Sequence, residues 1–155
     1  MQTLDKIDKA ILRHLQSNAR ISVTELASRV GLTKTPCHIR MKRLESLGYI
    51  LGYVTLLDPN KLGNNHIAFV QVTMNDTSSK ALQSFNDAVM KIPSVEQCHM
   101  IAGGFDYLLK VRTADMASFR AVLGEQISTL ANVVQTSTFV AMENIKDPHF
   151  KLTQN

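Results

Sequence analysis

The sequence concentrates basic side chains in one short segment, residues 34–43. They are Lys34, His38, Arg40, Lys42 and Arg43. Lysine and arginine bind phosphate oxygens and arginine also binds base edges, so the segment has the chemistry of a nucleic-acid contact. Apolar residues interleave with it at intervals of four, three and three, at Cys37, Met41, Leu44 and Leu47. This spacing predicts a helix with one apolar face and an opposite basic face, with Arg40 at the flank.

A basic helix face is also typical of an ordinary solvated surface, so the charge distribution must decide between the two interpretations. Residues 1–60 contain nine Lys or Arg against five Asp or Glu, whereas residues 61–155 contain eight of each. The chain's whole net charge of +4 therefore lies in the part that holds the basic helix. Such an excess is typical of a phosphate-binding surface. We expect contacts with double-stranded DNA from Thr33, Lys34, Thr35, His38, Arg40, Lys42 and Arg43.

Catalytic and metal chemistry find little support in the sequence. The histidines fall in five different expected elements, at positions 14, 38, 66, 99 and 149. Gly103-Gly104 belongs to no phosphate-loop motif. The doublets Cys37-His38 and Cys98-His99 place neighbouring side chains on different sides of a helix or strand, which does not suit a shared metal ion. We expect no enzyme, no metal, no cofactor and two free thiols.

A second, shorter helix precedes the basic one and completes a helix-turn-helix. Ser22 and Glu25 have the spacing of a capping box, and Gly31 is placed to end this helix. The basic helix then begins at either of two possible N-caps, Thr33 or Thr35. Two helices joined by a tight glycine turn, the second with a basic outward face, are typical of DNA-binding domains.

The flanking residues extend this motif to a winged domain over residues 1–60. Asp5 is expected to cap a first helix whose apolar stripe is Leu4, Ile7, Ile11, Leu12 and Leu15. Gly48 ends the basic helix, and residues 49–57 have the pattern of a hairpin turning at Gly52, which would form the wing. Residues 58–65 are dense in Pro, Gly and Asn and predict a hinge.

Residues 66–155 predict a second domain of β-α-β-β-α-β order, so that the chain as a whole is α+β. Strands are expected at 66–74, 95–102, 106–113 and 133–142, with helices at 79–91 and after Asp115. The second of these helices should turn Met116, Phe119, Leu123 and Leu130 inward. This order gives a ferredoxin-like sandwich, an antiparallel sheet with both helices on one face.

The other face of that sheet has no helix to cover it. Depending on register it carries Ile67, Phe69, Leu108 or Leu109, and Phe139 or Val140. Monomers seldom expose a large apolar surface, so we expect a second copy of the chain to cover it.

In their joint order, these features resemble the Lrp/AsnC (leucine-responsive regulatory protein/asparagine regulator) family of prokaryotic transcription factors, and within it the leucine-responsive members most. The resemblance covers about the whole chain. Its most specific segments are Thr35-Pro36-Cys37, Arg43-Leu44-Glu45, Gly48-Tyr49-Ile50, Cys98-His99, 103–109 (Gly-Gly-Phe-Asp-Tyr-Leu-Leu) and Leu123-Gly124-Glu125.

The resemblance implies a regulator of amino-acid metabolism that forms homodimers and higher assemblies such as octamers and acts in the cytoplasm at the nucleoid. No run of the sequence approaches the ~18 apolar residues of a membrane span, so we expect no membrane segment. It also implies an amino-acid effector at the seams between subunits. Carried over by position, the effector site would contain Met100, Gly103, Gly104, Asp106, Met116, Phe139, Val140 and Ala141.

Two alternatives remain open at the sequence level. Asp106 could pair with the ammonium group of an effector, while glycine amides hold its carboxylate, or it could simply cap its own turn. The chain departs from the family pattern at Ala102 and Gly104, where a small hydroxyl residue and an acid are common. An architectural DNA-binding protein without an effector is therefore the alternative function.

Overall fold

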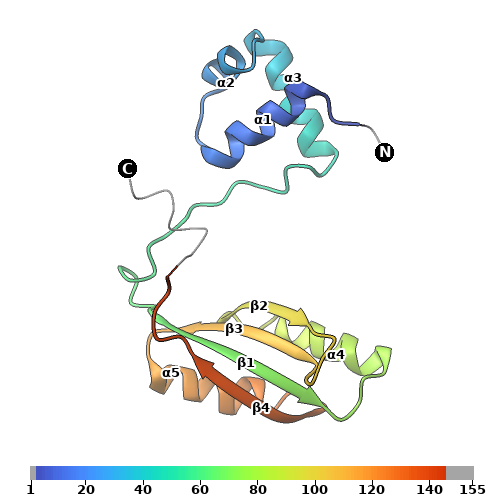
Figure 1. Cartoon of the computed structure of the whole chain (residues 1–155), viewed down its shortest axis with the longest axis vertical. Helices are drawn as coiled ribbons and strands as arrows, with labels where there is room; N and C mark the ends of the chain where they lie inside the picture. Colours follow the sequence, from blue (N-terminus) through green and yellow to red (C-terminus); the bar gives the residue numbers. More distant parts are fainter. Residues whose placement is uncertain (1–2, 146–155) are drawn as a thin grey trace. The chain divides into compact units, whose positions relative to one another are not determined.

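The computed structural model describes residues 3–145 and divides into two compact units, residues 1–55 and 56–155 (Figure 1). Each unit has a hydrophobic core of its own. The predicted α+β class is confirmed, with helices alone in the first unit and a sheet with helices in the second.

Unit 1 contains α1 (Lys6–Ser17), α2 (Val23–Arg29) and α3 (Lys34–Ser46). Asp5 caps α1 as expected, and its side chain and that of Asp8 form a reciprocal capping box. Ser22 caps α2 by accepting from the Glu25 amide at 3.1 Å. The three helices enclose a small core of Ile11, Leu15, Ile21, Leu26, Ala27, Cys37 and Leu44.

Two left-handed glycines shape the ends of α2 and α3. Gly31 has φ +70° and Gly48 has φ +74°, values that a residue with a side chain rarely adopts. After Gly31, the Leu32 amide donates back to Ala27 O at 2.8 Å, which closes the turn before α3. Thr33 is the N-cap of α3, although its side chain makes no capping hydrogen bond. Leu47, expected on the apolar face, is the C-cap residue and is 45% exposed.

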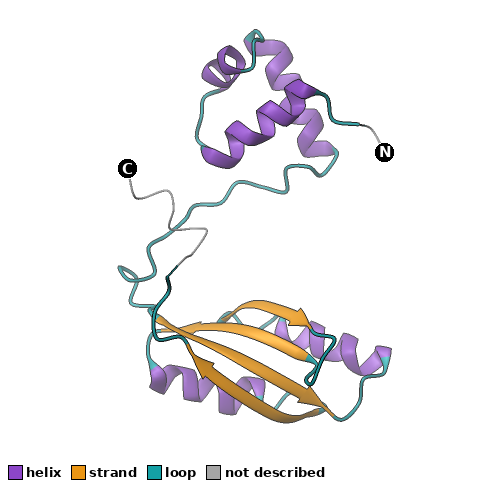
Figure 2. Ribbon diagram, viewed as in Figure 1, coloured by secondary structure: helices purple, strands orange, loops and turns teal. Residues whose placement is uncertain are grey.

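The expected hairpin over residues 49–57 is not formed. Residues 50–57 run as a loop, without a strand partner in the described part of the chain (Figure 2). Leu51, Val54 and Leu57 are exposed in it. Residues 49–57 are rich in Tyr, Ile and Val, which favours extended backbone. A strand also needs a neighbour for its backbone groups, and the single Gly52 does not fold this run back on itself.

Unit 2 is a four-stranded antiparallel sheet of order β2-β3-β1-β4. The strands are β1 (His66–Met74), β2 (Val95–Met100), β3 (Tyr107–Thr113) and β4 (Val133–Val140). The helices are α4 (Ser79–Val89) and α5 (Met116–Ala121), and α5 continues into the π-helix η1 (Val122–Ile127). The predicted ferredoxin-like order is confirmed.

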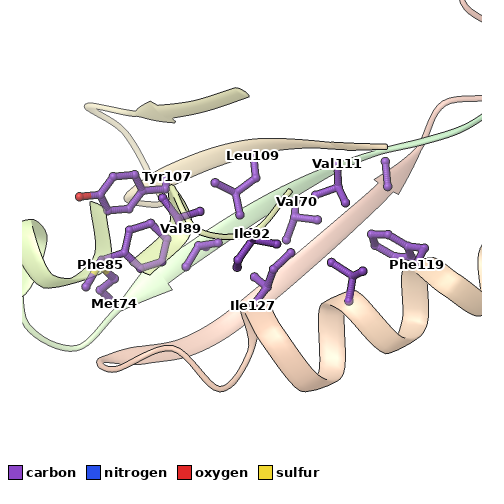
Figure 3. Close-up of a cluster of buried hydrophobic side chains, with 13 residues drawn as sticks. Val70, Met74, Phe85, Val89, Ile92, Tyr107, Leu109, Val111, Phe119 and Ile127 are labelled. Carbon is purple, nitrogen blue, oxygen red and sulfur yellow. The ribbon is translucent and has the colours of Figure 1, made fainter. Parts of the chain in front are cut away.

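Both helices lie on one face of the sheet and cover its core (Figures 2 and 3). Val70, Val72, Leu109 and Val111 are fully buried there, and the rings of Phe85 and Tyr107 pack with centroids 4.3 Å apart. Met116, expected to point inward, is instead exposed at the first position of α5. The wider π-turn brings Val122 and Ile127 into the core, with Leu123 only partly buried.

The strand register decides which residues lie on the uncovered face. Phe69 lies directly opposite Phe139 on one side and Lys110 on the other. Leu108 shares this face, whereas Leu109 is buried beneath the helices and Val140 lies opposite the buried Ala68. Toward β2 the face becomes polar, since Glu96 pairs with Lys110 at 3.0 Å and with Arg112.

Candidate nucleic-acid interface and ligand-binding loop

The outward face of α3 can be located from its buried face. Cys37 and Leu44 are fully buried against α1 and α2, and successive residues of a helix advance by about 100°. The line directly opposite them runs through Thr35, Ile39, Lys42 and Ser46 at helical spacing, and all four are exposed. The exposed His38 lies beside this line, and the exposed Thr33 and Lys34 lie at the N-terminal end of α3, with Thr33 as its N-cap.

Sequence reasoning missed Ile39, which lies at the centre of this line and is 62% exposed. Its apolar character hid it among positions that usually belong to a core. The spacing could have identified it, because it lies four residues after Thr35 and three before Lys42.

Lys42 keeps its charge at the surface. Its ammonium contacts Glu45 at 2.7 Å, but the lysine side chain remains 64% exposed. The Glu45 carboxylate accepts from Lys42 and also accepts a 3.1 Å hydrogen bond from Tyr53 Oη. Lys42 is the main group that lowers the Glu45 pKa, with the Tyr53 hydroxyl contributing less. An exposed pair of this kind is weak, so Lys42 remains available to a phosphate.

Arg40 and Arg43 have a different environment from the other predicted DNA-contacting residues. Arg40 Nη1 contacts Asp8 Oδ1 at 2.9 Å and Asp5 Oδ2 at 2.5 Å, and Arg43 Nη2 contacts Asp8 Oδ2 at 2.5 Å. The Asp8 side chain is 1% exposed, whereas those of Arg40 and Arg43 are 29% and 45% exposed. The two arginines thus join α3 to the start of α1 through one buried carboxylate.

The pKa shifts in this cluster follow from the same contacts. The Asp8 amide, then the Arg40 guanidinium, hold the pKa of Asp5 below its usual range. Asp5 and then Asp8 raise the pKa of Arg40. Two acids compensate two arginines here, so the positive charge available on the outward face comes mainly from Lys34 and from Lys42, whose pair with Glu45 is exposed.

The loop between β2 and β3 is tied to the end of β1 by Asp106. The Asp106 amide donates to Val72 O at 2.9 Å, and its Oδ2 accepts from the Met74 amide at 2.7 Å. Asp106 O accepts from the Ile101 amide at 2.8 Å. One carboxylate oxygen is thus engaged as a turn cap, while Gly103 and Gly104 beside it are exposed.

The structure separates the expected effector residues into two groups. Group A, at the β2–β3 turn, is Met100, Gly103, Gly104 and Asp106; group B, beyond the other end of β3 and at the end of β4, is Met116, Phe139, Val140 and Ala141. Figure 1 shows these regions at opposite ends of the sheet.

The strand register gives the scale of this separation. Val72 lies beside group A, and Ala68, paired with Val140, lies beside group B. Val72 comes four positions after Ala68 in β1, which is roughly 13 Å along the strand. Ala141 lines a shallow cavity of about 260 Å³ with Ile67, Arg112 and Asn144, away from group A. One copy therefore does not bring the two groups into one pocket.

The described residues also bear on metal binding and membrane insertion. Residues 3–145 contain no group of three or more His, Cys, Asp or Glu side chains placed to hold a metal ion. No helix in this part of the chain has the length and apolar character to cross a membrane.

Comparisons with protein families and curated proteins cover nearly the whole chain. Residues 4–50 match a winged helix-turn-helix DNA-binding model, and residues 67–149 match the Lrp/AsnC ligand binding domain. The chain is 57% identical to the proline dehydrogenase transcriptional activator of Rhizobium radiobacter, over 93% of this chain and 92% of the relative. It is 46% identical to the leucine-responsive regulatory protein of Escherichia coli K12, over 92% and 87%. The expected greater similarity to leucine-responsive members is therefore not confirmed.

Solved structures are similar over both units. An AsnC family transcriptional regulator from Agrobacterium tumefaciens matches with a TM-score of 0.87 and 35% identity, over 93% of this chain and 94% of that one. A regulator from Neisseria meningitidis, solved in complex with L-methionine, matches with a TM-score of 0.86 and 33% identity, over 94% of both chains. This chain, with its helix-turn-helix unit and its amino-acid ligand-binding domain, belongs to the Lrp/AsnC family of DNA-binding transcriptional regulators.

Proposed function

We propose that this protein places the outward face of α3 in the major groove and that an amino acid, bound between copies of the chain, changes its DNA binding or assembly. The observation that carries the proposal is the separation of group A from group B. Because the two groups lie at opposite ends of the sheet, only a second copy can complete a site that uses both.

The DNA part of the proposal assigns separate roles to the exposed residues of α3. Lys34 and Lys42 supply phosphate contacts, Thr33 and Thr35 lie where α3 enters the groove, and His38 meets a base edge. Two such helices in a dimer fit a pseudo-palindromic site with half-site centres about 34–36 Å, or a multiple of this, apart. Arg40 and Arg43 contribute by holding α3 in place, with Arg43 at the edge of the groove.

Lys34→Ala is expected to weaken binding to all DNA sequences alike, because it removes one phosphate contact. The salt slope, which is the slope of log affinity against log salt concentration, should become shallower by about one unit. His38→Ala is expected to relax base preference with little change in that slope. Fluorescence anisotropy across a salt series measures both. Lys80→Ala, which removes an exposed lysine from the first turn of α4, is the charge-matched control and should behave as wild type. An unchanged slope in Lys34→Ala would contradict the assignment.

Proline is our first candidate effector, and the promoter of a proline dehydrogenase gene our first candidate target. Both rest on the names of the relatives from Rhizobium radiobacter and Rhodobacter capsulatus, which are 57% and 53% identical to this chain. Methionine and leucine are the next candidates. A protein with this role acts at the nucleoid, in the cytoplasm.

Asp106→Asn should abolish effector binding and leave ligand-free DNA binding near normal. An asparagine oxygen can still accept from the Met74 amide, so the turn stays capped, but the negative charge that would pair with an α-ammonium is lost. Calorimetry with proline, leucine, methionine and alanine measures the loss, and Asp87→Asn on α4 is the matched control. In the wild type the effector should shift DNA affinity or assembly by roughly 5- to 150-fold.

The alternatives give different results in the same experiment. Equal binding by wild type and Asp106→Asn would place the site elsewhere. No binding of any of the twenty amino acids by the wild type would favour the architectural protein without an effector.

A further inference from the structure

We propose that Ile39 reads the 5-methyl groups of thymine in the major groove. Ile39 is 62% exposed at the centre of the outward line of α3, whereas the apolar residues of the same helix at Cys37 and Leu44 are fully buried. This inference rests on the proposed placement of α3 and specifies what its central residue recognises.

The chemistry of the groove selects the ligand. Thymine is the base that presents a methyl group in the major groove, and an apolar side chain is its complement. Isoleucine is branched at Cβ and stiff at χ1, so holding it against a methyl costs little conformational entropy. Burying one methyl group contributes about 0.8 kcal/mol, which is a factor of about four in affinity.

The contacts of the arginines point to the same preference. Arginine is the usual bidentate reader of guanine, but both arginines of α3 are engaged by the carboxylate of Asp8. The outward line instead presents the methyl-bearing Thr35 and Ile39 ahead of Lys42 and Ser46. This set favours a thymine-containing centre of each half-site over a guanine-containing one.

A single exposed apolar residue can also have no role, so the test must isolate the methyl group. The probe is a 30-base-pair duplex that the full wild-type chain selects from random DNA. It is prepared in two forms, one with thymine and one with 2′-deoxyuridine at the thymine positions of each half-site. Deoxyuridine lacks only the methyl group. Fluorescence anisotropy then gives the ratio of the two affinities for each protein.

Wild type should bind the thymine duplex about four-fold more tightly per methyl contacted, or about fifteen-fold when one methyl in each of two half-sites is contacted. Ile39→Ala should bind both duplexes with nearly equal affinity and an unchanged salt slope, and Ile39→Val should keep part of the preference. Lys42→Ala is the control, because it should weaken binding to both duplexes and leave their ratio as in wild type.

Equal wild-type affinity for the two duplexes would overturn the inference, as would an unchanged ratio in Ile39→Ala. Failure of the wider proposal gives a different result, in which Lys34→Ala and Lys42→Ala bind like wild type. Since Ile39 is exposed, its variants should have the same melting temperature as the wild type, and thermal denaturation checks this directly.

Discussion

Asp8→Ala is expected to unfold the helix-turn-helix unit at temperatures at which the wild type remains folded. The Asp8 carboxylate is buried and accepts hydrogen bonds from Arg40, Arg43 and the Asp5 amide. Its loss leaves two guanidinium groups close together with only Asp5 beside them. Breaking a fully buried ion pair costs about 3–5 kcal/mol, and since both arginines are partly exposed we expect about 2–3 kcal/mol here.

For a unit of this size the expected loss corresponds to a fall in melting temperature of roughly 8–24 °C. Hydrogen exchange of the full chain measures it by region: amides of residues 34–46 should exchange faster, and those of β1 and β3 should not change. Asp87→Ala, which removes an exposed acid on α4, is the control. Wild-type protection of α3 in Asp8→Ala would show that the cluster does not hold the helix.

The double variant Arg40→Ala/Arg43→Ala distinguishes a structural role from direct phosphate contact. If the arginines act mainly through Asp8, DNA affinity falls with the stability of unit 1 and the salt slope changes by less than one unit. If both bind phosphates, the slope falls by about two units even where the variant is fully folded.

Phe69→Lys is expected to convert the assembled protein to monomers. Phe69 and Phe139 lie side by side on the sheet face that no helix covers, and a second copy would bury both. Phe69 is 36% exposed in one copy, so burying the rest of it contributes roughly 0.5–1 kcal/mol, and a dimer loses this contribution twice. The dissociation constant should rise roughly 5- to 30-fold from the lost contact alone, and the cost of burying an unpaired lysine in its place raises it further. The new lysine would also lie directly opposite Lys110.

Sedimentation of the full chain at micromolar concentration measures the change. Met90→Lys is the matched control, because Met90 is an exposed apolar residue at the end of α4 and away from the sheet face. A wild-type monomer would contradict assembly itself. Wild-type sedimentation by Phe69→Lys would place the interface elsewhere.

The fold was predictable because its signals are local. The caps at Asp5 and Ser22, the turn at Gly31 and the alternation through β1 each specify a few neighbouring residues, and the structure confirms them. The hairpin prediction failed for residues 50–57, because a run of strand-forming residues favours extended backbone but does not provide a pairing partner.

The candidate site was less predictable because its arrangement depends on contacts between distant residues. Arg40 and Arg43 are of a residue type that commonly contacts DNA. Asp8 is 32 residues from Arg40 and 35 from Arg43 in the sequence, and only the fold brings it within their reach. Ile39 was missed because an apolar side chain in a helix usually belongs to the core, whereas this one is exposed. Likewise, no local pattern could show that group A and group B lie at opposite ends of the sheet.

That separation gives each copy of the chain a head and a tail. Where a seam joins group A of one copy to group B of the next without the reverse contact, the seam is heterologous, and copies added one after another form either an open row or a closed ring. An open row leaves an unpaired group A at one end and an unpaired group B at the other, whereas a ring has as many complete ligand sites as seams. A ligand that bridges the two groups would therefore favour closure, and the number of complete sites would report whether the ring is shut.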